Sequence, residues 1–342
     1  MPGPRGKGRA GHMDRLILFN ILYALMASEG REAVLFGRSA PAMNAAFSRS
    51  LGVPSAFPEV WFEIPLLGDS WCDVHALTSI DDARQGLTLG EGVRGASGDA
   101  FTWFAQQGDS VRQLALSWDT GSGNADVPAI QLLMRKNDVP VTCDFLSAVG
   151  RSDAVDAYRS FVQSLPDEWF ACYAGVFPER PGHNLRVECV PSHDMQRAYA
   201  EDAALLGRHL RQVGPSWVDD SLVALCQELA ALPFQLEFQF DVNAQGRAEG
   251  AFSASVRFAC PPGEPGYESF GMDGAAAELM TKLQDRGLVD GRWQALADVA
   301  FAKRVARGDG GVLLSAYPAF VKLRWRDGAL LDAKAYVIGG AQ

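Results

Sequence analysis

The amino-acid sequence predicts an α+β fold: one closed barrel of ten antiparallel strands, with helices outside and a polar lumen. Three observations predict it. Strand-like segments come in five pairs joined by short loops, helical segments separate the pairs, and nearly every strand alternates apolar with polar residues. Because a closed barrel removes the unpaired edges of an open sheet, five repeats of helix, two strands and helix are expected to form a ring.

Five hairpins are predicted from the strand pairs. Their connecting loops are rich in Gly, Pro, Asn and Asp, the residue types that hairpin turns require. The paired segments are residues 60–66 with 72–78, 112–119 with 129–136, 169–176 with 184–190, 235–242 with 253–259, and 320–326 with 332–338.

Helical periodicity marks the segments between the hairpins. Helices are predicted at residues 14–27, 41–51, 99–107, 152–165, 194–213, 217–232, 274–286 and 291–306. Ser216 and Asp219 have the spacing of a capping box, and Gly287 is typical of a helix C-terminus. These helices are expected to cover the outside of the barrel.

The chain is predicted to hold a single barrel domain over residues 14–342, behind a disordered basic leader at residues 1–13. The leader and the apolar run 16–27 together have the outline of a secretory signal. Asp14 before that run and Asn20 within it favour a buried first helix instead.

Composition and charge exclude several classes of partner. Apolar residues make up 48% of the chain and charged residues 21%, as in globular proteins, and the net charge is −10. The sequence has no Lys/Arg cluster that could neutralise a phosphate backbone, and no apolar run long enough to span a membrane, so neither nucleic acid nor a membrane is expected as a partner. The six cysteines are spaced singly, which favours free thiols and a cytoplasmic location. Cys172 and Cys189 are expected on the apolar side of their strands.

The alternation in the strands predicts where the polar side chains lie. In the segment 235–242, Leu236, Phe238 and Phe240 alternate with Gln235, Glu237 and Gln239. Successive side chains of a strand point to opposite faces of the sheet, and the amphipathic helices must cover the apolar face. The polar faces are therefore expected to line the lumen.

A ten-stranded barrel with outer helices and a polar lumen resembles the ABBA-type aromatic prenyltransferases, over about residues 55–342. The resemblance implies two substrates in the lumen: a prenyl diphosphate, and an aromatic small molecule or a peptide side chain as acceptor. In that family Lys/Arg-x-Tyr pairs hold the diphosphate, and Lys334-Ala335-Tyr336 matches the pattern. Arg186 and Arg257 are instead followed by Glu188 and Ala259.

Roles for the lumen residues follow from this resemblance. Arg and Lys donors in a water-poor cavity would stabilise the departing diphosphate. The diphosphate-binding candidates are Arg135, Arg186, Arg257, Lys322, Arg324, Lys334 and Tyr336. Glu63 is the catalytic candidate, since it would bind an acceptor N–H and help to remove its proton. The acceptor-binding candidates are Asp73, His75, Asp119, Tyr173 and Glu237. A need for magnesium is left open.

Two other functions compete with this interpretation. The polar lumen is also consistent with a lattice of salt bridges, such as Arg186 with Glu188 and Lys334 with Asp332, inside a non-catalytic carrier or chaperone barrel. The third hypothesis is a metal-dependent enzyme of the lumen. Its ligands would be Glu63, Asp73 and His75.

Overall fold

The computed structural model describes residues 13–37, 54–55, 59–84, 95–108, 110–120, 127–135, 137–178, 185–257, 274–307 and 310–341. The predicted leader lies outside these ranges except for Met13, and so does the helix expected at residues 41–51. Met13 belongs to β1 (Met13–Asp14), which pairs with β2 (Pro54–Ser55). No helix within the described ranges has the length and apolar character needed to span a lipid bilayer.

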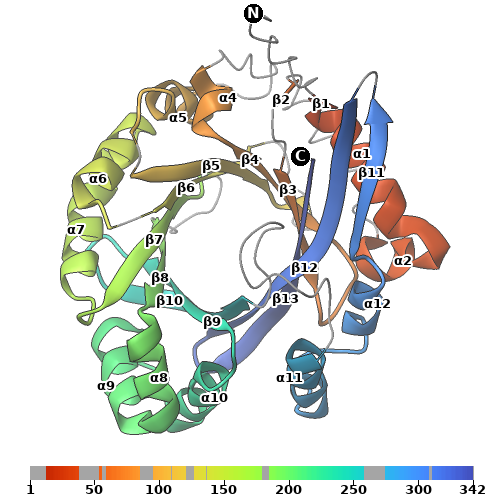
Figure 1. Cartoon of the computed structure of the whole chain (residues 1–342). Coiled ribbons are helices and arrows are strands. Elements are labelled where there is room, and N and C mark those ends of the chain that lie inside the picture. Colours follow the sequence, from red (N-terminus) through yellow and green to blue (C-terminus); the bar gives the residue numbers. More distant parts are fainter. Residues whose placement is uncertain are drawn as a thin grey trace, which may run out of the picture.

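Ten of the described strands close into one antiparallel barrel with helices around it (Figure 1). Neighbours follow chain order from β3 to β10, β13 pairs with β3, β12 pairs with β13, and the β10–β12 pairing completes the ring. The strands are β3 (Glu59–Pro65), β4 (Asp73–Thr78), β5 (Val111–Trp118), β6 (Ala129–Met134), β7 (Trp169–Val176), β8 (Leu185–Pro191), β9 (Gln235–Val242), β10 (Ala248–Arg257), β12 (Gly310–Arg326) and β13 (Ala329–Ala341). The closed ten-stranded barrel and its five hairpins are confirmed.

An additional strand, β11 (Phe301–Arg307), corrects the prediction of a helix at residues 291–306. The helix there, α12 (Trp293–Ala297), is short, and β11 pairs with the first part of β12. β12 is 17 residues long, so it extends beyond the segment that pairs with β10 and gives β11 a partner. Gly308 and Asp309 separate β11 from β12 in the sequence, and the dipeptide Asp309-Gly310, which includes the first residue of β12, is a hairpin signal.

The helices agree with the prediction in most places. They are α1 (Arg15–Ala27), α2 (Glu32–Leu35), α4 (Ile80–Arg84), α5 (Ala96–Phe104), α6 (Val139–Ala148), α7 (Val155–Gln163), α8 (His193–Glu201), α9 (Ala203–Val213), α10 (Asp220–Ala230) and α11 (Gly274–Asp285). α6 was not predicted. The helix expected at residues 194–213 is divided at Asp202, whose side chain caps α9 by accepting from the Leu205 N–H. Asp219 caps α10 through the Leu222 N–H, so the predicted cap at Ser216 is wrong.

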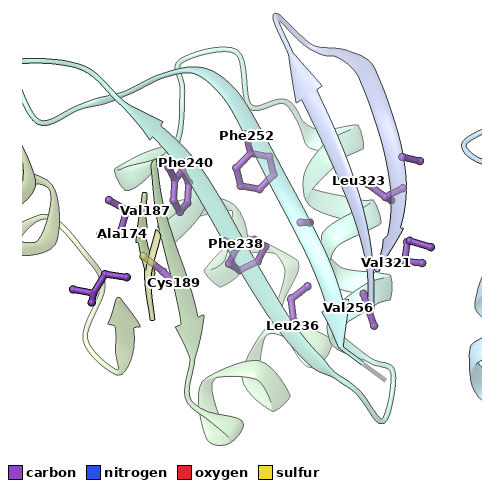
Figure 2. Close-up of a cluster of buried hydrophobic side chains, with 14 of the residues drawn as sticks. Ala174, Val187, Cys189, Leu236, Phe238, Phe240, Phe252, Val256, Val321 and Leu323 are labelled. Atoms are coloured by element: carbon purple, nitrogen blue, oxygen red, sulfur yellow. The ribbon is translucent and has the colours of Figure 1, made fainter. Parts of the chain in front are cut away.

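The hydrophobic core lies between the barrel and the helices (Figure 2). Phe238, Phe240 and Phe252 are fully buried on the outer face of β9 and β10. The Trp169 ring stacks on Phe238 with 5.1 Å between centroids, and its N–H donates to the Tyr199 hydroxyl of α8 at 2.6 Å. Replacing one of these phenylalanines by alanine would cost about 3–5 kcal/mol. This packing on the outer face leaves the polar side chains of the same strands facing the lumen.

Candidate active site

The barrel encloses a cavity of about 690 Å³, within the usual range for sites that bind small molecules. Of the predicted site residues, those lining it are Glu63, His75, Asp119, Arg135, Tyr173, Arg186, Glu237, Arg257, Lys322, Arg324, Lys334 and Tyr336. Arg135 is exposed, whereas Arg186 and Lys334 are buried. The four cations expected to converge, Arg135, Arg186, Arg257 and Lys334, thus line one cavity, with Arg135 at an exposed position.

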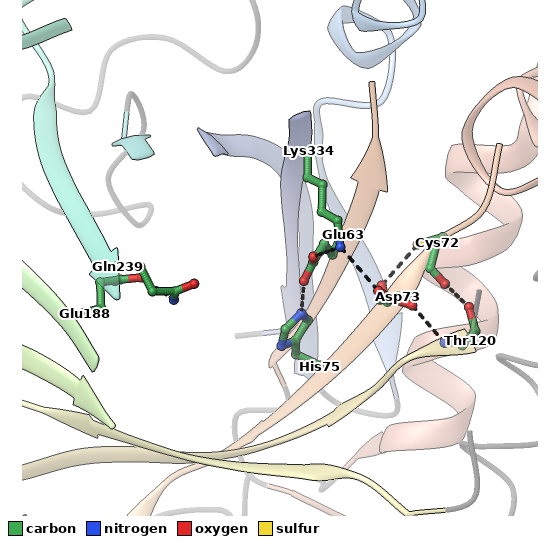
Figure 3. Close-up of polar contacts among 8 residues, drawn as sticks. All are labelled: Glu63, Cys72, Asp73, His75, Thr120, Glu188, Gln239 and Lys334. Atoms are coloured by element: carbon green, nitrogen blue, oxygen red, sulfur yellow. Dashed lines mark hydrogen bonds and ion pairs between the residues drawn. The ribbon is translucent and has the colours of Figure 1, made fainter. Parts of the chain in front are cut away.

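A chain of ionic contacts connects β3, β4 and β13 on one wall of the cavity (Figure 3). The Lys334 ammonium contacts Glu63 Oε1 and lies 3.6 Å from Asp73 Oδ2. Glu63 Oε2 lies 2.8 Å from His75 Nε2. The backbone N–H of Thr120 donates to Asp73 Oδ1 at 2.8 Å. Glu63 is thus held by two side chains that favour its charged form.

Electrostatics keep Glu63 ionised. Burial alone would raise the pKa of this carboxyl, but the charges of Lys334 and Lys322 and the hydrogen bond from His75 outweigh it and hold the pKa well below its usual range. An ionised carboxylate only accepts hydrogen bonds, so the proton of the His75–Glu63 bond belongs to Nε2. His75 Nδ1 has no hydrogen-bond partner among the described residues. Glu63 can therefore accept a hydrogen bond from a ligand.

Asp73 differs from the other acceptor-binding candidates because it does not line the cavity. It is 3% exposed and holds Lys334 from behind, with its other oxygen bound to the Thr120 N–H. Burial opposes the charge on Lys334, but the charges of Glu63 and Asp73 together raise the pKa of Lys334. Asp73 is therefore placed to position Lys334.

Three arginines of the lumen are paired with carboxylates. The pairs are Arg186 with Asp241 at 2.7 Å, Arg257 with Glu237 at 2.8 Å, and Arg324 with Asp332 at 2.6 Å. The predicted pairs Arg186–Glu188 and Lys334–Asp332 are wrong. Residues directly opposite in neighbouring strands meet more closely than residues two apart on one strand, and Asp241 is directly opposite Arg186.

Lys322 lacks such a partner. It is 8% exposed, and no carboxylate of the described chain lies within ion-pair distance of its ammonium. Register explains this: Lys322 is directly opposite Lys334, which contacts the carboxylates of β3 and β4. Burial lowers the pKa of Lys322 to about 8, and the positive charges of Lys334 and Arg186 act in the same direction. The negative charges of Glu63 and Glu188 oppose this shift but do not cancel it. The cavity thus contains a buried positive charge that has no counter-ion in the part of the chain that the structure describes.

A cluster of aromatic side chains in the lumen contacts this ammonium through Tyr336. Lys322 Nζ lies 4.6 Å from the centre of the Tyr336 ring, within the range of a cation–π contact. Tyr336 stacks on Phe320 with 4.0 Å between centroids, and Trp61 meets Phe320 edge to face. Burial, then the charge of Glu63, raises the pKa of Tyr336 well above its usual value. These rings offer an apolar surface beside the cationic and acidic groups.

The sequence interpretation of Cys172 is wrong, because this residue lines the cavity. The β7–β8 register changes between Ala171 and Tyr173, and such a bulge lets two consecutive side chains face the same side. Gly175 also helps to place Tyr173, since a Cβ there would collide with the tyrosine hydroxyl. Neither irregularity leaves a signal in the alternation of the sequence.

A further carboxyl group of the cavity, Glu188, was not predicted as a functional residue. It comes from β8, and the Gln239 amide donates to its Oε2 at 3.0 Å. Burial, then the negative charge of Glu237, raises the pKa of Glu188 to about 8. The sequence showed its lumen position but assigned it to a salt bridge with Arg186, which the register excludes.

The side chains proposed as metal ligands do not form a metal site. No group of three or more His, Cys, Asp or Glu side chains in the described ranges is arranged to hold one. The Lys334 ammonium lies between Glu63 and Asp73, where a metal shared with His75 would need space (Figure 3). These residues therefore do not fit the metal-dependent enzyme, nor do they supply a carboxylate site for magnesium.

Comparison with solved protein structures supports the barrel fold. No protein-family model and no curated protein sequence matches the chain. The solved apo structure of the prenyltransferase PriB is similar over 95% of this chain and 96% of its own, with a TM-score of 0.54 and 14% identity. A ternary complex of PriB with L-tryptophan and dimethylallyl thiolodiphosphate covers the same shares, with a TM-score of 0.53 and 15% identity. The fold of this chain is therefore that of the ABBA prenyltransferase barrel.

Proposed function

We propose that this protein transfers an isoprenoid from a prenyl diphosphate to an aromatic small molecule or a peptide side chain inside the barrel lumen. The observation that carries the proposal is Lys322, a buried ammonium for which the described residues provide no counter-ion, in a cavity lined by aromatic rings. A buried unpaired charge is costly, and an anionic ligand would compensate it. The PriB complex with a prenyl diphosphate analogue and tryptophan supports the choice of ligands.

The donor diphosphate would bind at Lys322. Arg186 and Tyr336 line the same cavity as Lys322. When the C1–O bond of the donor breaks, its electron pair goes to the diphosphate oxygen, and cations held in a water-poor site stabilise that charge. Arg135, Arg257, Arg324 and Lys334 would add to the positive field, although the last three already pair with carboxylates.

The acceptor would bind beside Glu63, with its ring against Trp61 and Tyr336. A ring atom of the acceptor forms the new bond to C1, and the proton that this atom loses, or that a ring N–H or O–H gives up, passes to Glu63. His75 orients the carboxylate, while Asp119, Tyr173 and Glu237 would complete the acceptor pocket. A bound diphosphate neutralises Lys322 and so makes Glu63 a stronger base when the donor is present.

The experiment is a product assay. Purified protein is incubated with dimethylallyl or geranyl diphosphate and a panel of indoles, phenols and aromatic peptides, and products are read by mass. We expect acceptors that gain one prenyl unit, and loss of that product in Glu63→Gln and Lys322→Met. Lys282→Met, at an exposed position of α11, is the matched control and should retain activity. No product from any donor and acceptor would refute the proposal.

A carrier or chaperone barrel is the second candidate, and the three paired arginines favour it, because charges neutralised inside a lumen need no ligand. It predicts that an aromatic ligand binds in the cavity and is released unchanged. Binding of diphosphate and acceptor together, without prenylated product over many hours, would support the carrier.

We also infer a cytoplasmic location from the cysteines, since Cys72, Cys143, Cys172, Cys189 and Cys226 are free thiols.

A further inference from the structure

Ser117 of β5 and Gln131 of β6 are polar side chains of the cavity wall that the proposed reaction does not use. Ser117 is 5% exposed and Gln131 is 6% exposed. Within the described ranges, nothing forms a hydrogen bond with the Ser117 hydroxyl or the Gln131 side-chain amide. A ligand that displaces water from two such groups must replace the lost hydrogen bonds or lose affinity. The acceptor is therefore expected to carry a polar group that matches them.

The register of the sheet explains why Gln131 has no partner in the described chain. It lies directly opposite Ala115 of β5 and Gly175 of β7, neither of which has a polar side chain. Ser117 lies directly opposite Ala129, two residues before Gln131 in β6. Diagonal neighbours of this kind are close enough for one small group to contact both side chains. Ser117 and Gln131 can therefore bind the same group of a ligand.

The chemistry of the Gln131 side chain selects that group. Its amide offers an N–H donor and an oxygen acceptor on one edge. A primary carboxamide presents the complementary edge, and its second N–H can donate to the Ser117 hydroxyl. A carboxylate would leave the Gln131 oxygen without a donor, and an ammonium would leave the Gln131 N–H without an acceptor. A trans secondary amide has its N–H and C=O on opposite edges, so it can pair with only one of the two atoms.

We propose that the acceptor is an aromatic compound with a primary carboxamide on its side chain, and that Gln131 and Ser117 bind this carboxamide while the ring lies against Trp61. This inference rests on the proposed prenyl transfer and names its acceptor class. It makes Gln131 and Ser117 specificity-determining residues, and it adds no bond-breaking step to the reaction.

The carboxamide site and the aromatic surface lie on one wall of the barrel. Trp61 is directly opposite His75, and His75 is directly opposite Ser117, so these residues cross β3, β4 and β5 in one row (Figure 1 shows the order of the strands). Gln131 lies one strand further. Neighbouring strands are about 4.8 Å apart, so β3 and β6 are separated by roughly 14 Å along the sheet. Because these side chains extend into the cavity, a bicyclic ring that packs on Trp61 and carries a short chain can reach Gln131.

The test measures how tightly acceptors bind to the protein saturated with dimethylallyl thiolodiphosphate, so the result does not depend on turnover. Three acceptors share an indole ring and differ at the end of the side chain: N-acetyltryptophanamide with a primary carboxamide, its N′-methylamide, and N-acetyltryptophan with a carboxylate. By calorimetric titration, we expect wild type to bind the primary carboxamide on the order of tenfold more tightly than the other two. Gln131→Leu should bind all three with similar affinity.

Two further variants keep the test decisive if Gln131→Leu does not fold. Ser117→Ala should weaken binding of the primary carboxamide roughly threefold to tenfold and leave binding of the N′-methylamide unchanged. Gln131→Glu offers only acceptor oxygens, so it should prefer an analogue in which an ammonium replaces the carboxamide. Gln294→Leu, at an exposed position of α12, is the matched control and should bind all acceptors like wild type.

Failure of this inference and failure of the proposed function give different results. If wild type binds the three acceptors equally, or if Gln131→Leu keeps the preference of wild type, the carboxamide site is overturned. Prenylated products in the product assay would then leave the proposed function standing. If wild type prefers the primary carboxamide but forms no prenylated product from any donor, the proposed prenyl transfer has failed and the carboxamide site stands.

Discussion

Replacing Lys322 by methionine should stabilise the fold while removing donor binding. Methionine retains the length of the side chain but carries no charge. Burial and the neighbouring cations lower the pKa of Lys322 from 10.5 to about 8, which corresponds to roughly 3 kcal/mol at 1.36 kcal/mol per pH unit. The variant also loses the cation–π contact with Tyr336, which reduces the expected stabilisation by about 1 kcal/mol. We therefore expect Lys322→Met to be more stable than wild type by roughly 2 kcal/mol at neutral pH.

The pH dependence follows from the sign of the perturbation. The folded protein binds the Lys322 proton more weakly than the unfolded chain does, so the cost of charging is complete below the folded-state pKa of about 8 and disappears as pH rises towards 10.5. The stability difference between Lys322→Met and wild type should therefore shrink between about pH 8 and about pH 10.5. Urea unfolding at several pH values measures it, with Lys282→Met as the control. A variant less stable than wild type, or a difference that does not change with pH, would refute the reasoning.

Three further predictions concern the remaining charges. Lys334→Ala should cost about 3–5 kcal/mol in urea unfolding because it leaves Glu63 and Asp73 buried without their cation; equal stability would contradict this. The pKa of Glu63 is held well below 4.5, so the stability that its charge contributes is present above pH 4.5 and is lost as pH falls through the folded-state pKa. Glu63→Gln should accordingly lose less stability than wild type on acidification, and parallel acid-unfolding curves would count against it. A double-mutant cycle of Arg186→Met and Asp241→Asn should give an interaction energy on the order of 1–3 kcal/mol, and simple additivity would exclude the ion pair.

The barrel could be predicted because its strands obey a local rule. Alternation places Phe238 outside and Glu237 inside without any knowledge of neighbours, and this determines which face the helices cover. Closure depends on β10 meeting β12, two segments far apart in the chain, and only the need to avoid open edges suggested it. β11 was missed because its partner is the part of β12 that precedes the predicted strand.

The residues that line the cavity could be predicted, but the ion pairs between them could not. Lys334, Glu63 and Tyr336 were assigned to the lumen from alternation, and they line it. Which cation meets which acid depends on register between strands, so the isolation of Lys322 opposite Lys334 could not be read from the sequence. The bulge that brings Cys172 into the cavity has the same origin, since one extra residue reverses every side chain after it.

The central claim, that the lumen binds a prenyl diphosphate at Lys322, is tested most directly by calorimetric titration of wild type and Lys322→Met with dimethylallyl thiolodiphosphate near pH 8. We predict that wild type binds and takes up protons, since the bound anion raises the pKa of an ammonium that is only partly charged at this pH. Lys322→Met should bind far more weakly and without this uptake. Equal affinity in the two proteins, or no binding to wild type, would contradict the account.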